Sequence, residues 1–530
     1  MYTVAHKIER AELSSYRQRR FTRRALILGG GGVAGALALG GSFASLRREA
    51  DGRVRIAMNQ NPATLDMSKV GAGVNVLRPA IENIVETLIE NDPNGDIRPG
   101  VCEWTISPDA KLVEYRVRPG VRFHTGDPVT AHDIKFSHDR LYRGLPSYRS
   151  RCYDLDRVEV VDDRIARFHF RTSGGTYLRT RGCYVYSRAW FDRVGDARFS
   201  AEPVGTGPYR MAEYRDAEYL DLDANDDYWG GPPAIRKARL LFVLEDMTRV
   251  AMLRAGDVDL VMAVPYPMVP VLAGMGFGQA RANVHPTFTV RFQLANPNTP
   301  WADRRVRLAI AHAIDSDAIV NGLFGGVPNH YTVFSPLEAG YDPTLRPYAY
   351  DPERARQLLR EAGYPNGFSM PLVYFANNYY GGRETAEAVT FFLRHVGITV
   401  NASALDSSHA IAFNRQYARD PNAVMVALGS GILANYSDPV EAMRFSYGTR
   451  PANSWYRNRD FDRLIEAAVM ANDDASRAAA LRACARKIHE DLQIIPLWNS
   501  VVVYMTRPGV QFRPTQRDVP LMRVKDMRLV

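Results

Sequence analysis

The sequence predicts an α/β protein with several domains. It has 530 residues, more than one ordinary core holds, and domain-size statistics give roughly three or four units. Its composition of 46% hydrophobic and 24% charged residues is that of a folded chain rather than a disordered one. After residue 50, strand patterns alternate with helix patterns, which is typical of α/β layers with substantially parallel sheets.

The first part of the chain carries clear strand and helix signals. Residues 54–58 and 113–117 show the period-2 alternation of strands. Apolar residues at steps of four, three and four positions predict a helix over residues 77–88. Thr130-Ala-His-Asp133 is a capping-box sequence and predicts that a helix begins there. Residues 159–170 predict a β-hairpin that turns at two adjacent aspartates.

The rest of the chain continues the same alternation. Predicted helices cover residues 247–254, 303–314, 351–363, 384–396, 461–471 and 475–491. Predicted strands cover residues 260–264, 398–401 and 494–505. Gly256, Gly363 and Gly397 mark helix ends, and Asp351-Pro352 places a capping residue and a first-turn proline at a helix start.

The N-terminus has the three parts of an export signal. Residues 1–24 are basic, residues 25–44 are apolar, and Ser42-Phe43-Ala44 is a small-x-small cleavage sequence. Thr22-Arg-Arg-Ala-Leu-Ile27 is similar to the twin-arginine motif, although it has Leu where Phe is usual. We therefore expect a twin-arginine signal peptide over residues 1–44, with an ordinary Sec signal as the alternative.

The same segment argues against a permanent membrane attachment. Seven of the 20 residues from Ala25 to Ala44 are glycine, which makes a weakly hydrophobic span and disfavours an uncleaved anchor. No cysteine lies between residues 25 and 50 to carry a lipid. We therefore expect a free protein in the periplasm, and no later segment is apolar enough to predict a membrane span.

The net charge of +9 is concentrated in this signal. Residues 1–44 hold seven basic and two acidic residues, a net charge of +5, which leaves +4 for the other 486 residues. A nucleic-acid-binding protein gathers its basic residues on one surface, and no such block follows. The sequence therefore predicts no nucleic-acid partner.

Four cysteines remain, at positions 102, 152, 183 and 484. Their spacing fits no zinc or iron–sulfur pattern. Export permits disulfides, and the hairpin predicted between Cys152 and Cys183 could bring the two together. A disulfide between Cys152 and Cys183 is one hypothesis, and two buried free thiols are the other.

The sequence shows no catalytic or cofactor motif. Gly205-Thr-Gly207 is followed by proline, so it predicts a turn rather than a dinucleotide loop. Ser430 lies between two glycines but lacks the Gly-x-Ser-x-Gly arrangement of a nucleophile elbow. His124, His132 and His138 have no metal-ligand spacing. We expect no enzyme, no catalytic residue, no cofactor and no metal.

Ten short segments recur in one order along the chain. They are Pro62–Asp66, Glu86–Gly95, Arg98–Gly100, Arg118–His124, Asp133–Phe136, Pro203–Tyr209, Asn225–Gly231, Trp301–Ile310, Tyr350–Ala355 and Ile495–Trp498. In order and spacing they resemble the family-5 bacterial solute-binding proteins, which include dipeptide and oligopeptide receptors. The resemblance spans roughly residues 54–505, nearly all of the chain that follows the signal.

This resemblance implies a two-lobed periplasmic binding protein fold of type II, in its large class with an extra subdomain. Lobe I would comprise residues 51–287 and 500–530, with the extra subdomain near 95–200, and lobe II residues 288–499. Two crossing strands would form the hinge, and the extended apolar stretches Val284–Phe292 and Trp498–Met505 suit them.

The resemblance also implies a function and a site. The chain would be a monomeric, extracytoplasmic substrate-binding subunit that delivers a peptide-like or other polar solute to an ABC permease and its ATPase. In peptide receptors of the family, a buried aspartate receives the peptide's amino terminus, and the matching position here is Asn435. The other implied contacts are Ser430, Gly431, Phe292, Asn61, Trp498 and Asn499.

Asn435 predicts a ligand that is not a conventional free-amine peptide. A buried ammonium group needs a carboxylate, whereas asparagine offers only a neutral carbonyl and an amide. A blocked peptide, a glycoside or an opine-like compound would fit, unless the alignment slips or another acid supplies the charge. We read Asp438, the second aspartate of the motif, as the cap of a helix that starts near Pro439.

Two other functions stay open at this point. A receptor that presents its ligand to a sensor would use the same hinge. A periplasmic enzyme is the less favoured alternative, because twin-arginine export often serves cofactor-loaded proteins.

Overall fold

The computed structural model describes residues 52–70, 74–375, 381–405, 413, 416–418, 420, 422–430, 438–449, 454–471, 473–516 and 521–530. All of them belong to one compact unit, Ala50–Val530. The predicted signal peptide, residues 1–44, lies outside the described residues, as do Gly431 and Asn435. No helix in the described ranges is long and apolar enough to cross a membrane.

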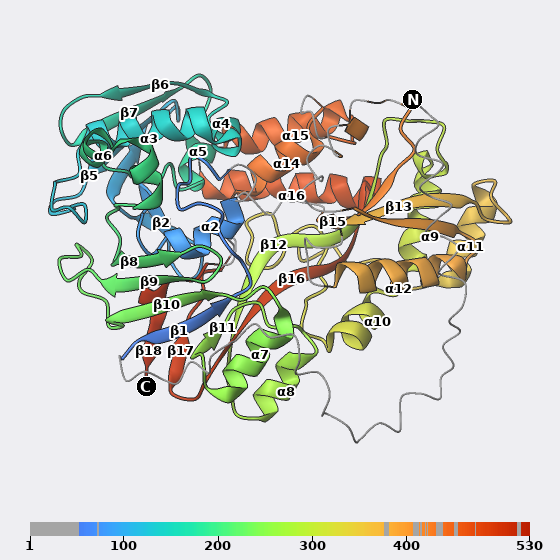
Figure 1. The fold of residues 1–530 in the computed structure, drawn as a ribbon. Coiled ribbons are helices and arrows are strands. Elements are labelled where there is room, and N and C mark those ends of the chain that lie inside the picture. Colours follow the sequence, from blue (N-terminus) through green and yellow to red (C-terminus); the bar gives the residue numbers. More distant parts are fainter. Residues whose placement is uncertain are drawn as a thin grey trace, which may run out of the picture. The chain divides into compact units, whose positions relative to one another are not determined.

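One ten-stranded sheet runs through the fold (Figure 1). Its strands, in spatial order, are β14 (Thr399–Leu405), β13 (Ser369–Phe375), β15 (Val426–Ser430), β12 (Gly278–Phe292), β16 (Ile494–Thr506), β11 (Leu260–Val261), β1 (Val54–Met58), β10 (Lys237–Phe242), β9 (Tyr219–Ala224) and β8 (Tyr209–Arg215). Strand β1 is parallel to β10 and β11, and β13 is parallel to β14 and β15. The long antiparallel pair β12 and β16 joins these two parallel groups.

A second sheet has four antiparallel strands. These are β4 (Cys102–Ile106), β5 (Leu112–Val117), β7 (Ile165–Phe170) and β6 (Leu155–Val160). Two-stranded sheets pair β2 (Ile89–Asn91) with β3 (Ile97–Pro99) and β17 (Val510–Phe512) with β18 (Met527–Leu529). The predicted hairpin over residues 159–170 is therefore confirmed as β6 and β7.

Helices pack on these sheets and on one another. They are α2 (Val74–Ile81), α3 (Ala131–Gly144), α4 (Pro146–Arg151), α5 (Gly175–Arg179), α6 (Arg188–Ala201), α7 (Asp246–Ala255), α8 (Met268–Gly274), α9 (Arg304–Ala313), α10 (Ser316–Ala318), α11 (Pro352–Glu361), α12 (Gly382–Arg394), α14 (Pro439–Tyr447), α15 (Arg459–Met470) and α16 (Asp474–Asp491). Short helices η1 (Pro300–Ala302), η2 (Ile319–Leu323) and η4 (Val524–Asp526) complete the set that the structure describes. Figure 1 shows α14, α15 and α16 stacked together, and their apolar faces share one core.

The capping signals in the sequence are confirmed. Thr130 and Asp133 make both bonds of the capping box at the start of α3. Asp351 caps α11 with Pro352 in its first turn, and Gly256 ends α7 in the left-handed conformation, with φ of 81°. These ends are set by local chemistry, which explains why the sequence alone located them.

The helix predicted over residues 77–88 is wrong at its end, because α2 stops at Ile81. Asn83 follows, and its amide nitrogen donates to the carbonyls of Pro79 at 3.2 Å and Met522 at 2.8 Å. A side chain that satisfies carbonyls in this way competes with continued helix. The apolar spacing beyond Ile81 serves an irregular segment that packs into the same core.

Glu86 joins three of the segments that carry the family resemblance. Its carboxylate accepts hydrogen bonds from Thr206 at 2.8 Å, Tyr228 at 2.6 Å and the Trp229 ring nitrogen at 2.9 Å. Burial raises the pKa of Glu86 above its ordinary value, and these donors satisfy the carboxylate inside the fold. The conserved-looking aromatic pair therefore serves the scaffold.

The glycines beside Thr206 allow two backbones to touch. A Cβ atom at Gly205 would lie 2.1 Å from the Ile84 carbonyl oxygen, and one at Gly207 would lie 2.6 Å from that of Asn83. Only glycine fits such a close approach. The turn predicted at Gly205-Thr-Gly207 is thus a contact between distant parts of the chain.

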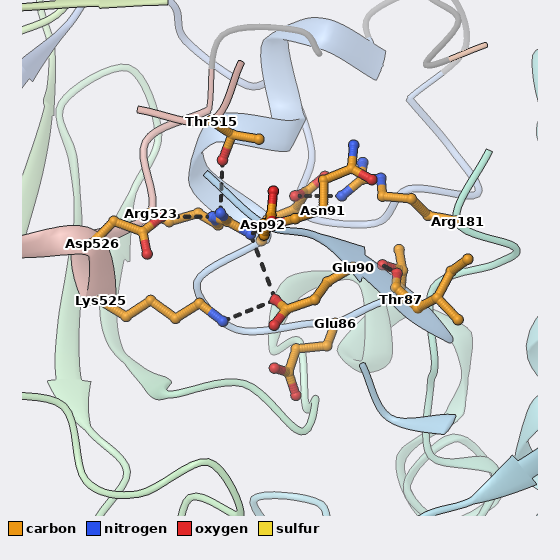
Figure 2. Close-up of polar contacts among 12 residues, drawn as sticks. Glu86, Thr87, Glu90, Asn91, Asp92, Arg181, Thr515, Arg523, Lys525 and Asp526 are labelled. Atoms are coloured by element: carbon orange, nitrogen blue, oxygen red, sulfur yellow. Dashed lines mark hydrogen bonds and ion pairs between the residues drawn. The ribbon is translucent and has the colours of Figure 1, made fainter. Parts of the chain in front are cut away.

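The C-terminal segment is fastened to strand β2 (Figure 2). Lys525 donates to Glu90 at 3.0 Å, and the buried guanidinium of Arg523 lies 3.5 Å from the same carboxylate. Arg523 also donates to Thr515 at 2.6 Å. These bonds hold residues near the C-terminus against an early part of the chain.

The four cysteines are buried and free in the structure. The disulfide hypothesized between Cys152 and Cys183 is therefore not formed there, and the alternative of buried thiols holds. Burial raises the pKa of Cys183 to about 12, so its thiol stays protonated at neutral pH. Within the described ranges, no group of three or more His, Cys, Asp and Glu residues could hold a metal ion.

Candidate ligand-binding site

The carboxyl ends of the parallel strands mark the expected place for a site. Ligands of open α/β sheets bind in the crevice outside these ends. Strands β1, β10 and β11 end at Met58, Phe242 and Val261, and the paired registers bring these ends to one edge. The residues after β1 are three consecutive amides, Asn59, Gln60 and Asn61.

These amides are short of partners. Oδ1 of Asn59, Oε1 of Gln60 and Oδ1 of Asn61 are buried, and none has a hydrogen-bond partner among the described residues. An unsatisfied buried acceptor costs about 1–3 kcal/mol, so three adjacent ones call for a donor from outside the chain. Asn61 was predicted as a contact, whereas Asn59 and Gln60 were missed although they continue the same polar run.

The second parallel group ends in the same manner. Strands β13, β14 and β15 end at Phe375, Leu405 and Ser430. The segments that follow them, residues 376–380, 406–412 and 431–437, lie outside the described residues. Gly431 and Asn435 fall in the third of these, and the backbone of Ser430 pairs with Phe288 of β12.

Asp438 closes the segment that contains Asn435. Its Oδ1 accepts from the Val440 amide at 2.7 Å, so it caps α14 with Pro439 in the first turn, as predicted. Its Oδ2 pairs with Arg477 of α16, and both side chains are buried, at 1% and 3% exposure. The buried pair fixes the start of α14 and with it the end of the preceding segment.

A cavity of about 620 Å³ opens beside this ion pair. Residues from two distant parts of the chain line it: Asn91, Gly95, Asp96, Ile97, Arg98 and Arg179 from one, and Leu337, Glu338, Ala339, Asp438, Pro439, Asp474, Arg477, Ala478 and Leu481 from the other. Its volume lies in the range of small-ligand sites. Four carboxylates and three guanidiniums line the cavity, which suits a polar ligand.

Known proteins share this arrangement. Residues 97–454 match the family described as bacterial extracellular solute-binding proteins, family 5 Middle. The chain belongs to this family. Family-5 proteins are the substrate-binding components of ABC importers.

Relatives and solved structures agree with the family. The glutathione-binding protein GsiB of Pectobacterium atrosepticum is 27% identical over 58% of this chain and 61% of its own length, which is less than two thirds of that protein. Heme-binding protein A of Haemophilus influenzae is 26% identical over 78% of this chain and 81% of that protein. These relatives are described as binding proteins, not enzymes.

The solved structure of the ABC transporter-associated periplasmic binding protein DppA from Helicobacter pylori, in complex with the peptide STSA, has a TM-score of 0.73. Its sequence is 23% identical, over 90% of this chain and 98% of that one. This family-5 chain therefore has the two-lobed type II fold, as predicted.

Three predicted contacts of this solute-binding protein lie in its packed interior. Phe292 of β12 has no exposed surface. Trp498 of β16 is 1% exposed and stacks on Phe288 with ring centroids 4.6 Å apart, while its ring nitrogen donates to Thr385. In this conformation Phe292 and Trp498 offer no free face to a ligand, and their role as contacts stays a prediction.

Asn499 joins the two crossing strands to a neighbouring loop. Its Nδ2 donates to Thr287 of β12 at 2.9 Å, and its Oδ1 accepts from the Tyr331 amide at 2.6 Å. The pairing of β12 with β16 shifts register between Asn283 and Thr287. Asn499 thus lies at the irregular point of the strand pair that the sequence predicted as the hinge.

A buried cation lies on β12 near this point. The guanidinium of Arg291 lies 4.5 Å from the centroid of the Trp455 ring, and burial lowers its pKa to about 10. Arg291 stays positively charged at neutral pH, because that pKa is well above 7. Sequence patterns missed it, since a lone arginine in a strand normally predicts a wet face.

Proposed function

We propose that this protein captures a peptide-sized polar solute outside the cytoplasm and delivers it to an ABC permease and ATPase in the membrane. The observation that carries the proposal is the site itself: a polar cavity beside Asp438, at the end of the segment that holds the family's ligand-binding position. Capture between two lobes follows the hinge-closure mode of binding proteins.

The lobes we propose are residues 51–287 with 500–530, and residues 288–499, with an extra subdomain near 95–200. Two observations support this division. Strands β12 and β16 link the two parallel strand groups of the large sheet. The cavity is lined by residues from both proposed lobes, such as Arg98 and Arg477.

The ligand we propose is a donor-rich solute without a free α-amino group, such as a blocked peptide, a glycoside or an opine-like compound. Asn435 stands where peptide receptors have an aspartate, so a buried ammonium would lack its carboxylate. The unpaired amide oxygens of Asn59, Gln60 and Asn61 support hydroxyl or N–H groups on the ligand.

The setting we propose is the periplasm, reached through a twin-arginine signal over residues 1–44. The basic stretch before the apolar stretch, and the motif Thr22–Ile27, support this route. Blocking the twin-arginine pathway in the source cell would stop export, whereas export that continues through the Sec pathway would refute the assignment.

A thermal-shift panel tests the ligand class. It would pair Ala-Ala-Ala with N-acetyl-Ala-Ala-Ala, and add glutathione, haem, an opine and a glycoside. A ligand at 100 times its Kd adds about 2.7 kcal/mol of stability. At about 2.1 cal/mol/K per residue, the 481-residue unit Ala50–Val530 gains about 3 °C in Tm.

The matched peptides give the decisive comparison. We expect a shift with the acetylated peptide or a non-peptide solute and none with the free amine. Asn435→Asp should reverse that preference, because it supplies the missing carboxylate. A free-amine peptide that stabilises the wild type would contradict the proposed ligand class, and unchanged affinity in Asn435→Ala would place this residue outside the site.

A further inference from the structure

Helices α14 to α16 meet an early part of the chain at the rim of the cavity. Arg179, the last residue of α5, forms an ion pair with Asp474, the first residue of α16. Both residues line the cavity. Their side chains are 26% and 93% exposed, so the pair lies at the surface rather than in the core.

A second contact lies between the same two parts. The guanidinium of Arg444 in α14 lies over the Tyr153 ring, 3.1 Å from its centroid. A cation over an aromatic face is attracted to the negative centre of the ring. Tyr153 precedes β6, and so belongs with α5 to the proposed extra subdomain near residues 95–200.

We propose that the Arg179–Asp474 pair and the Arg444–Tyr153 contact form a latch that holds the two lobes closed over the cavity. The inference rests on the proposed function, because Arg179 and Tyr153 fall in proposed lobe I and Asp474 and Arg444 in proposed lobe II. Neither contact survives if the lobes separate about β12 and β16. Each therefore adds free energy only to the closed state.

The exposure of Asp474 sets the strength of this latch. A carboxylate that keeps most of its water loses little on opening, and exposed pairs contribute little to stability. Among the described residues, Arg179 is the only ion-pair partner of Asp474. We therefore expect a weak latch that shifts the open-to-closed ratio about two- to fivefold and weakens as salt screens it.

Lobe separation can be measured without any ligand. Spin labels would be placed at Val161→Cys and Ala467→Cys, both exposed, in protein whose native cysteines are buried. Double electron–electron resonance then gives the distance distribution between the proposed subdomain and α15. The readout needs no bound solute, so failure of the latch and failure of solute binding are told apart.

Charge reversal with a swap gives the test. Asp474→Arg should raise the long-distance population about two- to fivefold, and Arg179→Asp combined with Asp474→Arg should return it to the wild-type level. Asp460→Arg is the matched control, because the partner of Asp460 is Arg463 on the same helix. The proposal is overturned if Asp474→Arg leaves the distances unchanged, or if the swap fails to restore them.

Discussion

Removing the charge of Asp438 tests how the structure holds the start of α14. Asp438→Asn keeps the shape of the side chain and its ability to cap the helix, since asparagine caps as well as aspartate. What it removes is the carboxylate that balances Arg477, in a pair whose side chains are 1% and 3% exposed. Loss of one partner from a buried pair costs about 3–5 kcal/mol, because the other charge stays buried.

The assay is thermal unfolding of the purified protein. With an unfolding entropy of about 2.1 cal/mol/K per residue, a loss of 3–5 kcal/mol lowers the Tm of the 481-residue unit by about 3–5 °C. Asp438→Asn with Arg477→Met should recover most of this loss, because no buried charge remains.

Asp473→Asn is the matched control. Asp473 also caps a helix, accepting from Ser476 at 2.8 Å, but it is exposed and forms no ion pair in the described part of the chain. We expect a change within about 0.5 kcal/mol for this variant. An Asp438→Asn protein as stable as the control, or a double variant no better than the single one, would refute the reasoning.

Three further predictions concern the scaffold. Trp498→Ala should lower the free energy of unfolding by about 3–5 kcal/mol in denaturant titrations, because a fully buried ring stacked on Phe288 is lost; a loss below about 1 kcal/mol would contradict the packing. Burial lowers the pKa of His138 from 6.5 to about 4, so the unfolded chain binds the proton first as pH falls, and about 3 kcal/mol of stability should disappear between pH 6.5 and 4. His138→Gln should flatten that part of the profile, and an unchanged slope would contradict the assignment. A thiol reagent should react with none of the cysteines in the native protein and with four after unfolding; two reactive thiols after unfolding would mean that a disulfide exists after all.

The elements of the fold followed from local signals where those signals were complete. The capping box at Thr130, the cap at Asp351 and the glycine after α7 each lie within a few residues of the end they set. Helix α2 was different, because a long-range bond from Asn83 to Met522 ends it early. Strand β1 was predicted from its alternation, yet all five of its residues are buried, since parallel neighbours lie on both sides.

The site could be predicted only in part. The motif at residues 429–439 located Asp438 as a helix cap, and the structure confirms that role. The cavity could not be predicted, because Arg98, Arg179 and Asp474 meet only through the tertiary fold. The unpaired amides after β1 were also hidden, since a lack of partners is visible only once all neighbours are in place.

The most direct test of the central claim is a titration followed by recovery of the ligand. The solute with the largest thermal shift would be titrated calorimetrically into the protein, and the mixture would then be denatured and examined by mass spectrometry. A receptor should bind one solute molecule per chain and return it chemically unchanged. Conversion of the solute to a product, or heat without saturation at one site, would contradict the account.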